Sequence, residues 1–300
     1  MKKQILLILL TVSIFNLFGA TPIKISKSTT RHGPEKGSLI IIGGGVITPD
    51  IWNKFTELAG GAENANIVVI TTAAGDSAGL ETRTVELVKA QTKIKKVVRL
   101  HTNDLKEANS EKFVEALKTA TGVFFEGGRQ WRIADSYLNT LTHQAFLDVL
   151  SRGGVIAGTS AGASIQGSFL WRGDTSGAEI LVGDHTQGLG FLRNSVIDQH
   201  ILKRNRQFDL VTIIKTNPQL IGIGLDESTA VLVQKDTLRV LGKSYVAIYD
   251  YNTIQGDGPK HKTEKGEDFT ASNGPFFFLH EGQKYDLGSR TVIKEKPVKK

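Results

Sequence analysis

Short runs of consecutive apolar residues alternate along the chain with longer segments whose apolar residues recur every three or four positions. The runs are typical of strands buried on both faces, and the longer segments are typical of amphipathic helices. In the segment that begins at Pro49, for example, Ile51, Phe55 and Leu58 share one helical face. The pattern predicts strands at residues 39–42, 67–70, 96–100, 123–125 and 154–157, and further helices at residues 81–91, 111–117 and 142–150.

The regular alternation of strand and helix predicts parallel strands joined by right-handed crossovers, with helices covering both faces of the sheet. After about residue 220 the pattern changes to short strands at residues 221–223, 230–233, 238–240 and 246–248. We expect these strands to extend the same domain in antiparallel fashion. The predicted fold class is therefore α/β, with a mostly parallel central sheet and an antiparallel C-terminal extension, in one domain over residues 37–290.

The first twenty residues have the pattern of a secretory signal. Lys2 and Lys3 precede a nearly unbroken apolar stretch at residues 5–18, and Gly19 and Ala20 supply small residues for cleavage. An uncleaved anchor is the alternative, but the stretch is shorter than the roughly 20 residues of a membrane span. We predict a signal peptide at residues 1–20, a linker at residues 21–36, and export to the periplasm or the extracellular space without stable membrane insertion after cleavage.

The composition excludes several kinds of chemistry. The 300 residues include no cysteine, so the chain has no disulfide, thiolate nucleophile or cysteine-ligated zinc. Its 37 Lys and Arg against 30 Asp and Glu give a mild net charge of +7, and four of the lysines lie in a basic tail at residues 291–300. We therefore expect no nucleic-acid partner. The 32 glycines indicate many tight turns, as at the strand ends of an α/β fold.

Ser160 lies directly after the predicted strand at residues 154–157, within the run Gly158-Thr159-Ser160-Ala161-Gly162-Ala163. A nucleophilic serine on a tight strand-to-helix turn needs small neighbours, because the backbone there is strained and exposed. The amide of Ala161 would then help to stabilise an oxyanion. The alternative is a glycine-rich turn whose serine only caps a helix.

A nucleophilic serine needs a base, and His185 and His200 are the nearest histidines downstream of it. If a helix begins at Ile201, His200 and Arg204 share a face one turn apart, with Arg206 close by. A base beside two guanidinium groups indicates a site that holds an anionic substrate group. The alternative is the start of an ordinary surface helix.

Two other kinds of site are less well supported by the residues. Asp184, His185, Asp198 and His200 are metal-binding residue types, but their spacing does not support a metal site, so we expect no metal and no cofactor. Residues 43–45 are three glycines after a strand, but no G-x-G-x-x-G pattern is completed. We interpret them as a turn at the active edge of the sheet.

Together these segments resemble the cyanophycinase and peptidase E group of serine peptidases. The resemblance covers roughly residues 37–250 and includes the Ser160 run, Asp198-Gln199-His200, and two further stretches at residues 125–130 and 222–230. It implies a three-layer αβα sandwich like that of flavodoxin and the class I glutamine amidotransferases. It also implies hydrolysis through an acyl-enzyme, as by a serine-type exopeptidase. In the amidotransferases the nucleophile is cysteine, which this chain lacks.

Residue roles also follow from the resemblance. Ser160 would be the nucleophile and His200 the general base. Asp174 would be the acid of the triad, with Glu179 as the alternative. The remaining site residues would be the oxyanion donors Gly128 and Ala161 and the substrate-binding residues Gln130, Asp198, Gln199, Arg204 and Arg206. Trp131 and Trp171 flank this site in sequence and are candidates for stacking on a substrate.

The expected substrates are aspartyl-linked peptides. Cyanophycin, a poly-aspartate backbone with arginines on the β-carboxyls, is one, and β-aspartyl or isoaspartyl peptides are the others. A homodimer is one expected assembly, because dimers are common in the group. A non-catalytic binding protein that keeps the fold and its pocket is the alternative from a different class.

Overall fold

The computed structural model describes residues 32–79, 81, 83–251, 254, 260–262, 268–270 and 276–294. The predicted signal peptide lies outside these residues, as do positions 295–300 of the predicted tail. His32, Gly33 and Pro34, at the end of the predicted linker, are buried against the domain. The backbone amide of His32 donates to Asp236, so the packed domain begins a few residues earlier than expected. No helix within the described ranges is long and apolar enough to cross a membrane.

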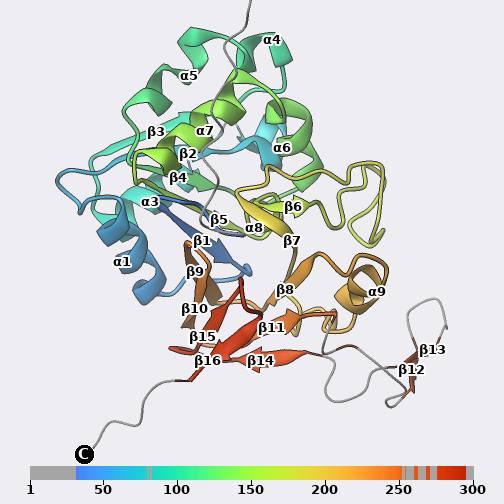
Figure 1. Cartoon of the computed structure of the whole chain (residues 1–300). Helices are drawn as coiled ribbons and strands as arrows, with labels where there is room; N and C mark the ends of the chain where they lie inside the picture. The colour runs from blue at the N-terminus through green and yellow to red at the C-terminus, as the bar shows by residue number, and fades with distance from the viewer. Residues whose placement is uncertain are drawn as a thin grey trace, which may run out of the picture.

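The larger sheet has nine strands in the order β16-β15-β10-β9-β1-β5-β4-β2-β3 (Figure 1). Its parallel half contains β1 (Ser38–Ile42), β2 (Asn66–Ile70), β3 (Lys96–Leu100), β4 (Gly122–Phe125) and β5 (Val155–Thr159). Its antiparallel half contains β9 (Thr229–Gln234), β10 (Thr237–Gly242), β15 (Lys284–Asp286) and β16 (Thr291–Ile293). The sheet therefore changes from parallel to antiparallel at β1.

A second sheet of five strands has the order β14-β11-β8-β7-β6. Its members are β6 (Gly167–Phe169), β7 (Leu192–Gln199), β8 (Ile221–Leu225), β11 (Val246–Tyr249) and β14 (Phe277–Leu279). Strand β8 runs parallel to β7 and antiparallel to β11. A separate short pair joins β12 (Lys260–Lys262) to β13 (Asp268–Thr270).

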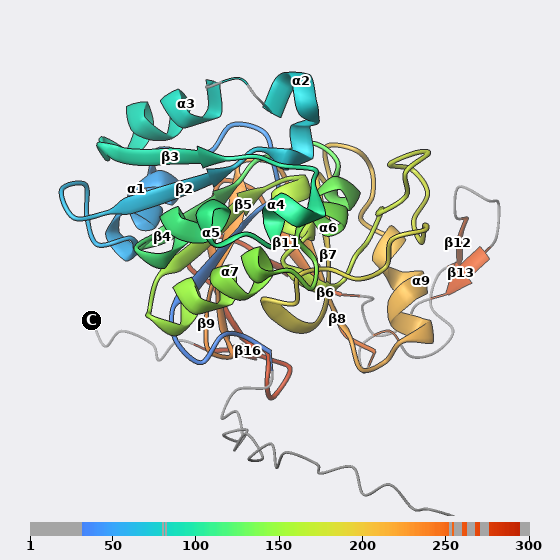
Figure 2. The same ribbon diagram turned by 90° about the horizontal axis from the view of Figure 1, so that it is seen from above.

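Helices cover both faces of the parallel strands, with α3 on one side and α5 and α7 on the other (Figure 2). The longer helices are α1 (Pro49–Leu58), α3 (Arg83–Thr92), α5 (Glu111–Lys118), α6 (Gln130–Tyr137), α7 (Leu141–Ser151) and α9 (Asp209–Thr216). The shorter ones are η1 (Thr72–Ala74), α2 (Asp76–Gly79), α4 (Leu105–Ala108) and α8 (Ala161–Ser164).

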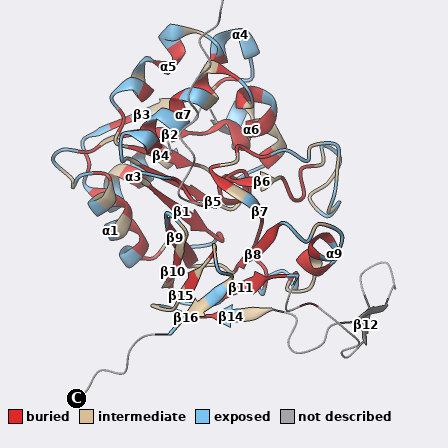
Figure 3. Cartoon of the chain, in the orientation of Figure 1, coloured by how far each residue is buried: buried red, intermediate tan, exposed pale blue. Residues whose placement is uncertain are grey.

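Alternate residues of each central strand enter different cores, because side chains of a strand point to opposite faces. On β1, Ile40 and Ile42 pack with Trp52 and Phe55 of α1, whereas Leu39 and Ile41 pack into the core shared with the second sheet. A third core lies between the second sheet and α9. Both faces of the central strands are thus buried, as Figure 3 shows, which explains their unbroken apolar runs.

The predicted α/β class, the five parallel strands and the antiparallel C-terminal strands are confirmed. The predicted single extension is in fact divided, because the strand at residues 221–225 belongs to the second sheet and the strands at residues 229–242 belong to the first. The helix considered from Ile201 does not form: residues 201–205 are turns, and the φ angles of His200 and Asn205 are +56° and +55°. Left-handed residues at both ends prevent a helix there.

Candidate active site

The carboxyl end of β1 holds the two segments that carry the candidate nucleophile and base. Strands β1 and β5 pair in parallel up to Ile42 and Thr159, and the next amide, that of Ser160, donates to the carbonyl of Ile42 at 3.0 Å. On the other side, the amide of His200, which follows β7, donates to the carbonyl of Gly43 at 3.0 Å. Ser160 and His200 are therefore fixed to consecutive carbonyl groups of one strand end.

Ser160 occupies a strained backbone conformation, with φ +54° and ψ −113°. A non-glycine residue adopts this region only where its surroundings enforce it. The surroundings here are small: a Cβ added at Gly158 would lie 2.1 Å from the carbonyl oxygen of Gly162, and one at Gly127 would lie 3.4 Å from Cβ of Ser160. The small neighbours predicted for a nucleophile turn are thus required by close backbone contacts.

Ser160, His200 and Glu227 form a chain of hydrogen bonds. Oγ of Ser160 lies 3.0 Å from Nε2 of His200, and Nδ1 of His200 lies 2.7 Å from Oε1 of Glu227. Because a carboxylate only accepts, Nδ1 carries the proton that is donated to Glu227, and Nε2 is left to accept the proton of the Ser160 hydroxyl. This is the arrangement of a serine nucleophile with an oriented general base.

The electrostatic surroundings keep the imidazole in its neutral, proton-accepting form. Burial lowers the pKa of His200 below its ordinary value of 6.5, and the positive charges of Arg204 and Arg206 lower it further. The hydrogen bond to Glu227 acts in the opposite direction but does not outweigh burial. At neutral pH the ring is therefore ready to accept a proton.

The carboxylate beside His200 differs from both residues expected there. The side chain of Asp174 accepts from the amides of Ser176 and Asp184, and Glu179 accepts from Arg206. Nδ1 of His200 instead meets Glu227, which lies in the turn between β8 and β9. The sequence carried a signal for it, since Glu227 follows a buried strand at its carboxyl end, as Ser160 does.

The turn at residues 43–45 lies directly against this chain of hydrogen bonds. A Cβ at Gly44, whose φ is +114°, would lie 2.2 Å from Cε1 of His200, and one at Gly45 would lie 2.8 Å from Cβ of Glu227. The carbonyl of Gly44 also accepts from the amide of Ser228 at 2.9 Å. The glycines therefore let the backbone approach the imidazole and the carboxylate, which agrees with a turn at the active edge of the sheet.

The two candidate oxyanion donors belong to segments on either side of Ser160. Ala161 is the first residue of α8 and is fully buried. Gly128 has a φ of +144°, and a Cβ there would lie 2.1 Å from the carbonyl oxygen of Ala73. The next amide, that of Arg129, donates to the same carbonyl at 2.8 Å. The loop after β4 is thus held tightly against η1, with Gly127 facing Ser160.

Two of the expected substrate-binding side chains, those of Asp198 and Gln130, form hydrogen bonds within the protein. Asp198 is completely buried and accepts from Trp171 Nε1 at 3.2 Å and from Arg172 Nε at 3.1 Å. Nε2 of Gln130 donates to the carbonyls of Trp171 and Arg172 at 2.8 and 2.9 Å. Both side chains therefore position residues 171–172 beside the site. Trp171 itself is buried, so it does not offer a face for stacking.

The other three expected substrate-binding residues remain near His200. Arg204 is exposed, and its amide donates to the carbonyl of His200 at 2.8 Å. Gln199 and Arg206 are buried, but Oε1 of Gln199 and both Nε and Nη1 of Arg206 have no hydrogen-bond partner within the described part of the chain. Buried polar atoms are normally paired, so these atoms are candidates for contact with a ligand.

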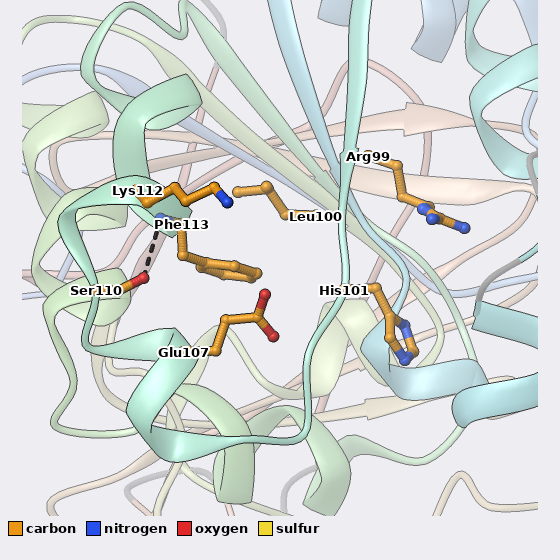
Figure 4. Close-up of a pocket in the computed structure, with 7 residues that line it drawn as sticks. All are labelled: Arg99, Leu100, His101, Glu107, Ser110, Lys112 and Phe113. Atoms are coloured by element: carbon orange, nitrogen blue, oxygen red, sulfur yellow. Dashed lines mark hydrogen bonds between the residues drawn. The ribbon is translucent and has the colours of Figure 1, made fainter.

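A hollow of about 350 Å³ lies elsewhere, at the carboxyl end of the edge strand β3 (Figure 4). It is lined by Arg99, His101, Glu107, Lys112 and Phe113, among others, and Ser160 is three strands away in the sheet. Its mixed charges suit no single ligand class. Within the described residues no group of three histidines, aspartates or glutamates is placed to hold a metal ion. Ser160 and its partners are therefore the candidate active site.

Comparison with known proteins agrees with the motifs. Residues 39–241 match the model of peptidase family S51. The cyanophycinases of Synechococcus elongatus and Nostoc sp. are each 30% identical to the chain, over 275 and 279 residues. These alignments cover 89% of this chain in both cases, and 84% and 92% of the two relatives.

Among solved structures, a peptidase from an acI-B1 Actinobacterium matches with a TM-score of 0.61 at 22% identity, over 84% of this chain and 97% of that one. It shows that the two proteins share a fold. The resemblance inferred from the motifs is thus confirmed by sequence and fold alike. The chain belongs to peptidase family S51.

Proposed function

We propose that the protein is a serine-type exopeptidase that hydrolyses aspartyl-linked peptides, with cyanophycin and its β-Asp-Arg units as the leading substrates. The observation that carries the proposal is the chain of hydrogen bonds from Ser160 through His200 to Glu227. The names of the related cyanophycinases support the choice of substrate. Aspartyl or isoaspartyl dipeptides are the second choice within the same chemistry.

The proposed reaction has two steps. His200 takes the proton of Ser160 as Oγ attacks the scissile carbonyl carbon, while Glu227 holds the imidazole and stabilises its positive charge. His200 then protonates the leaving amine, and the acyl group stays on Oγ as an ester. A water molecule that gives its proton to His200 attacks the ester, and the departing Oγ recovers a proton.

The amides of Gly128 and Ala161 are the proposed donors to the oxyanion. Gly128 lies in the loop whose Gly127 faces Ser160, and Ala161 directly follows Ser160. Both donors are backbone N–H groups, so no side chain has to be positioned for them. Fixed backbone donors of this kind stabilise the tetrahedral intermediate without having to reorganise during the reaction.

Positive charge beside His200 supports a substrate with a carboxylate near the scissile bond. Arg204 and Arg206 both act on the pKa of His200, so both lie within electrostatic reach of it. The amide oxygen of Gln199, which has no hydrogen-bond partner among the described residues, adds an acceptor for a substrate N–H group. We further propose that the protein is exported and acts outside the cytoplasm on polymer or peptides, as a homodimer.

A substrate panel tests the proposal. The mature protein is incubated with cyanophycin, a β-Asp-Arg dipeptide and an isoaspartyl dipeptide, and products are identified by mass spectrometry. We expect hydrolysis that falls at least about 10⁴-fold in Ser160→Ala, the scale of losing a serine nucleophile. Activity that survives this substitution excludes Ser160 as the nucleophile. If the protein binds the substrate but neither hydrolyses it nor is labelled by a fluorophosphonate, it is instead a non-catalytic binding protein.

A further inference from the structure

Arg206 has an unusual combination of burial and unmet hydrogen bonding. Its side chain is only 3% exposed, and its Nη2 donates to Oε1 of Glu179 at 2.7 Å. Its Nε and Nη1 are buried without a partner within the described ranges. Leaving a buried donor unpaired costs roughly 1–3 kcal/mol. The guanidinium therefore has donors available for further acceptor oxygens beyond the one that Glu179 supplies.

Glu179 is a weakly held partner for such a group. Its side chain is 69% exposed, although the two arginines that it meets, Arg206 and Arg172, are 3% and 1% exposed. Arg172 does not depend on it, because Arg172 already contacts Asp198 and Asp209. An exposed carboxylate keeps most of its hydration, so its ion pair contributes little to stability.

Glu179 lies in a loop, residues 172–187, that contains no helix and, apart from a single bridge from Gln187 to Phe169, no strand pairing. Its neighbours Ala178 and Leu181 accept hydrogen bonds from Arg172 through their carbonyls, whereas the side chain of Glu179 is exposed. In Figure 1 this loop lies between α6 and α9. Both ends of the loop contact α6 or its N-terminus. Arg129, which precedes α6, donates to the carbonyl of Asp174 at 2.5 Å, and His185 lies 2.7 Å from Asp135 of α6. The middle of the loop carries the exposed side chains of Ile180 and Val182, and Glu179 contacts Arg206 at the end of the 201–206 turn.

We propose that Glu179 is an internal stand-in for the substrate carboxylate, which occupies Arg206 in the free enzyme and is displaced when an aspartyl substrate binds. This inference rests on the proposed function, since that function makes Arg206 a reader of carboxylates. Displacement exchanges one carboxylate for another, so the buried guanidinium is never left without a counter-charge. A substrate carboxylate with two free oxygens also satisfies donors that Glu179 leaves unpaired.

The displacement makes Glu179 a specificity-determining residue. A ligand without a carboxylate cannot displace Glu179 from Arg206, so it gains no contact with the guanidinium. A ligand with a carboxylate binds with an affinity lowered by the competing Glu179. Removing that competition strengthens binding without touching the chain of hydrogen bonds at Ser160.

Glu179→Gln tests this prediction, with Glu86→Gln on α3 as the matched control. Glu86 is 63% exposed and pairs with Lys89, so its substitution makes the same change of charge far from the site. We expect KM for a β-Asp-Arg dipeptide to fall by about two- to fivefold in Glu179→Gln, the range of an ion pair whose carboxylate is exposed. The kcat and the rate of labelling by a neutral fluorophosphonate should not change, and Glu86→Gln should match the wild type. A KM that rises or stays constant overturns the proposal, because Glu179 would then only support Arg206.

A binding experiment separates this inference from the proposed function. N-acetyl-aspartate is titrated calorimetrically into Ser160→Ala and into the Ser160→Ala, Glu179→Gln double variant. We expect Kd to fall by about two- to fivefold in the double variant even if no peptide is ever hydrolysed. In that case the proposed function fails and the inference stands. An unchanged or higher Kd, or no binding in either protein, overturns the inference.

Discussion

At the scale of single residues, the site depends on contacts that leave very little space around the imidazole of His200. Glu227 bonds to one ring nitrogen, Ser160 to the other, and Gly44 lies against the carbon between them. The backbone of His200 is in the left-handed region, with a φ of +56°, and its amide donates to the carbonyl of Gly43. The ring therefore has one position, and changes on any of its three sides should affect catalysis.

Glu227→Gln should lower kcat/KM by about 10³–10⁴-fold, because an amide no longer fixes the tautomer that leaves Nε2 free to accept. Of the two other acids considered for this role, Asp174→Asn should retain most of the activity, and Glu179→Gln should show no loss of kcat. Steady-state kinetics on a β-aspartyl dipeptide measures all three. Equal, small losses in all three variants would contradict the role of Glu227.

Gly44→Ala should lower kcat/KM about 100-fold or more, since a displacement of about 1 Å in a catalytic group is enough for such a loss. The added methyl group would lie 2.2 Å from Cε1 of His200. Gly61→Ala is the control: its φ is also positive, at +83°, but its Cβ would meet no atom within 4 Å. If both variants lose activity equally, backbone strain rather than contact with the ring is responsible.

At the scale of elements, the loop at residues 172–187 depends on α6 for its position. His185 contacts Asp184 of the same loop and Asp135 of α6, each at 2.7 Å. Burial disfavours the charged imidazole, but the hydrogen bonds to Asp184 and Asp135 prevail and raise the pKa of His185 above 6.5. A raised pKa means that the ion pairs stabilise the fold fully below pH 6.5 and are lost as the pH rises through the folded-state value.

Asp135→Asn should therefore lower the thermal stability in acid more than in base. Because Asp135 is 54% exposed, the ion pair contributes at most about 1 kcal/mol, or a shift in Tm of about 2–4 °C in a chain of this size. The Tm of both proteins is measured at about pH 6 and about pH 8.5, on either side of the titration of His185. A difference that grows toward high pH would contradict the assignment.

The elements that could be predicted from the sequence are those whose signal is local. The five parallel strands are short and largely apolar. Side chains on both faces of the central strands are buried, such as Ile41 and Val69, so the run of apolar residues alone predicts a strand. The β7 strand was missed because its sequence contains no apolar run: residues 193–195 are polar, and the strand ends with Asp198 and Gln199, which are polar although both are buried. The burial of Asp198 depends on partners distant in sequence, Arg172 and Trp171, which no local pattern contains.

The residues of the candidate site that could be predicted are likewise those with a local signal in the sequence. Ser160 and His200 stand out by their neighbours in sequence, and the structure brings them within hydrogen-bond distance. Glu227 was missed because two strands with different sheet partners flank it: β8 pairs with β7, and β9 pairs with β1. The pairing of distant strands brings Glu227 to His200, and strand pairing is the least local property of a fold.

At the scale of the whole molecule, the last strands of the chain hold the two sheets together. Strand β14 adds to the second sheet beside β11, and β15 adds to the first beside β10. Tyr285 of β15 is fully buried in the core that the two sheets share, and its ring lies 5.8 Å from that of Phe277 on β14. The C-terminal strands are therefore part of the core of the fold.

Tyr285→Ala should lower the free energy of unfolding by about 3–5 kcal/mol, the usual loss for a large aromatic side chain removed from a core. Tyr285→Phe should have little effect, because the buried hydroxyl has no hydrogen-bond partner within the described part of the chain. Urea denaturation of both variants measures the difference. A large loss in Tyr285→Phe would show that the hydroxyl has an important partner.

Neither sheet carries the proposed triad alone. Ser160 follows β5 of the first sheet, His200 follows β7 of the second, and Glu227 lies in the connection from one sheet to the other. A cut in the partly exposed stretch between Thr175 and Val182 would leave the proposed nucleophile on one fragment and the proposed base and acid on the other. By the proposed mechanism each fragment alone would be inert, and we expect reassembly of the two fragments, with β1 paired to β9, to restore turnover. The architecture thus suits the protein to use as a split reporter, in which activity signals that two fused partners have met.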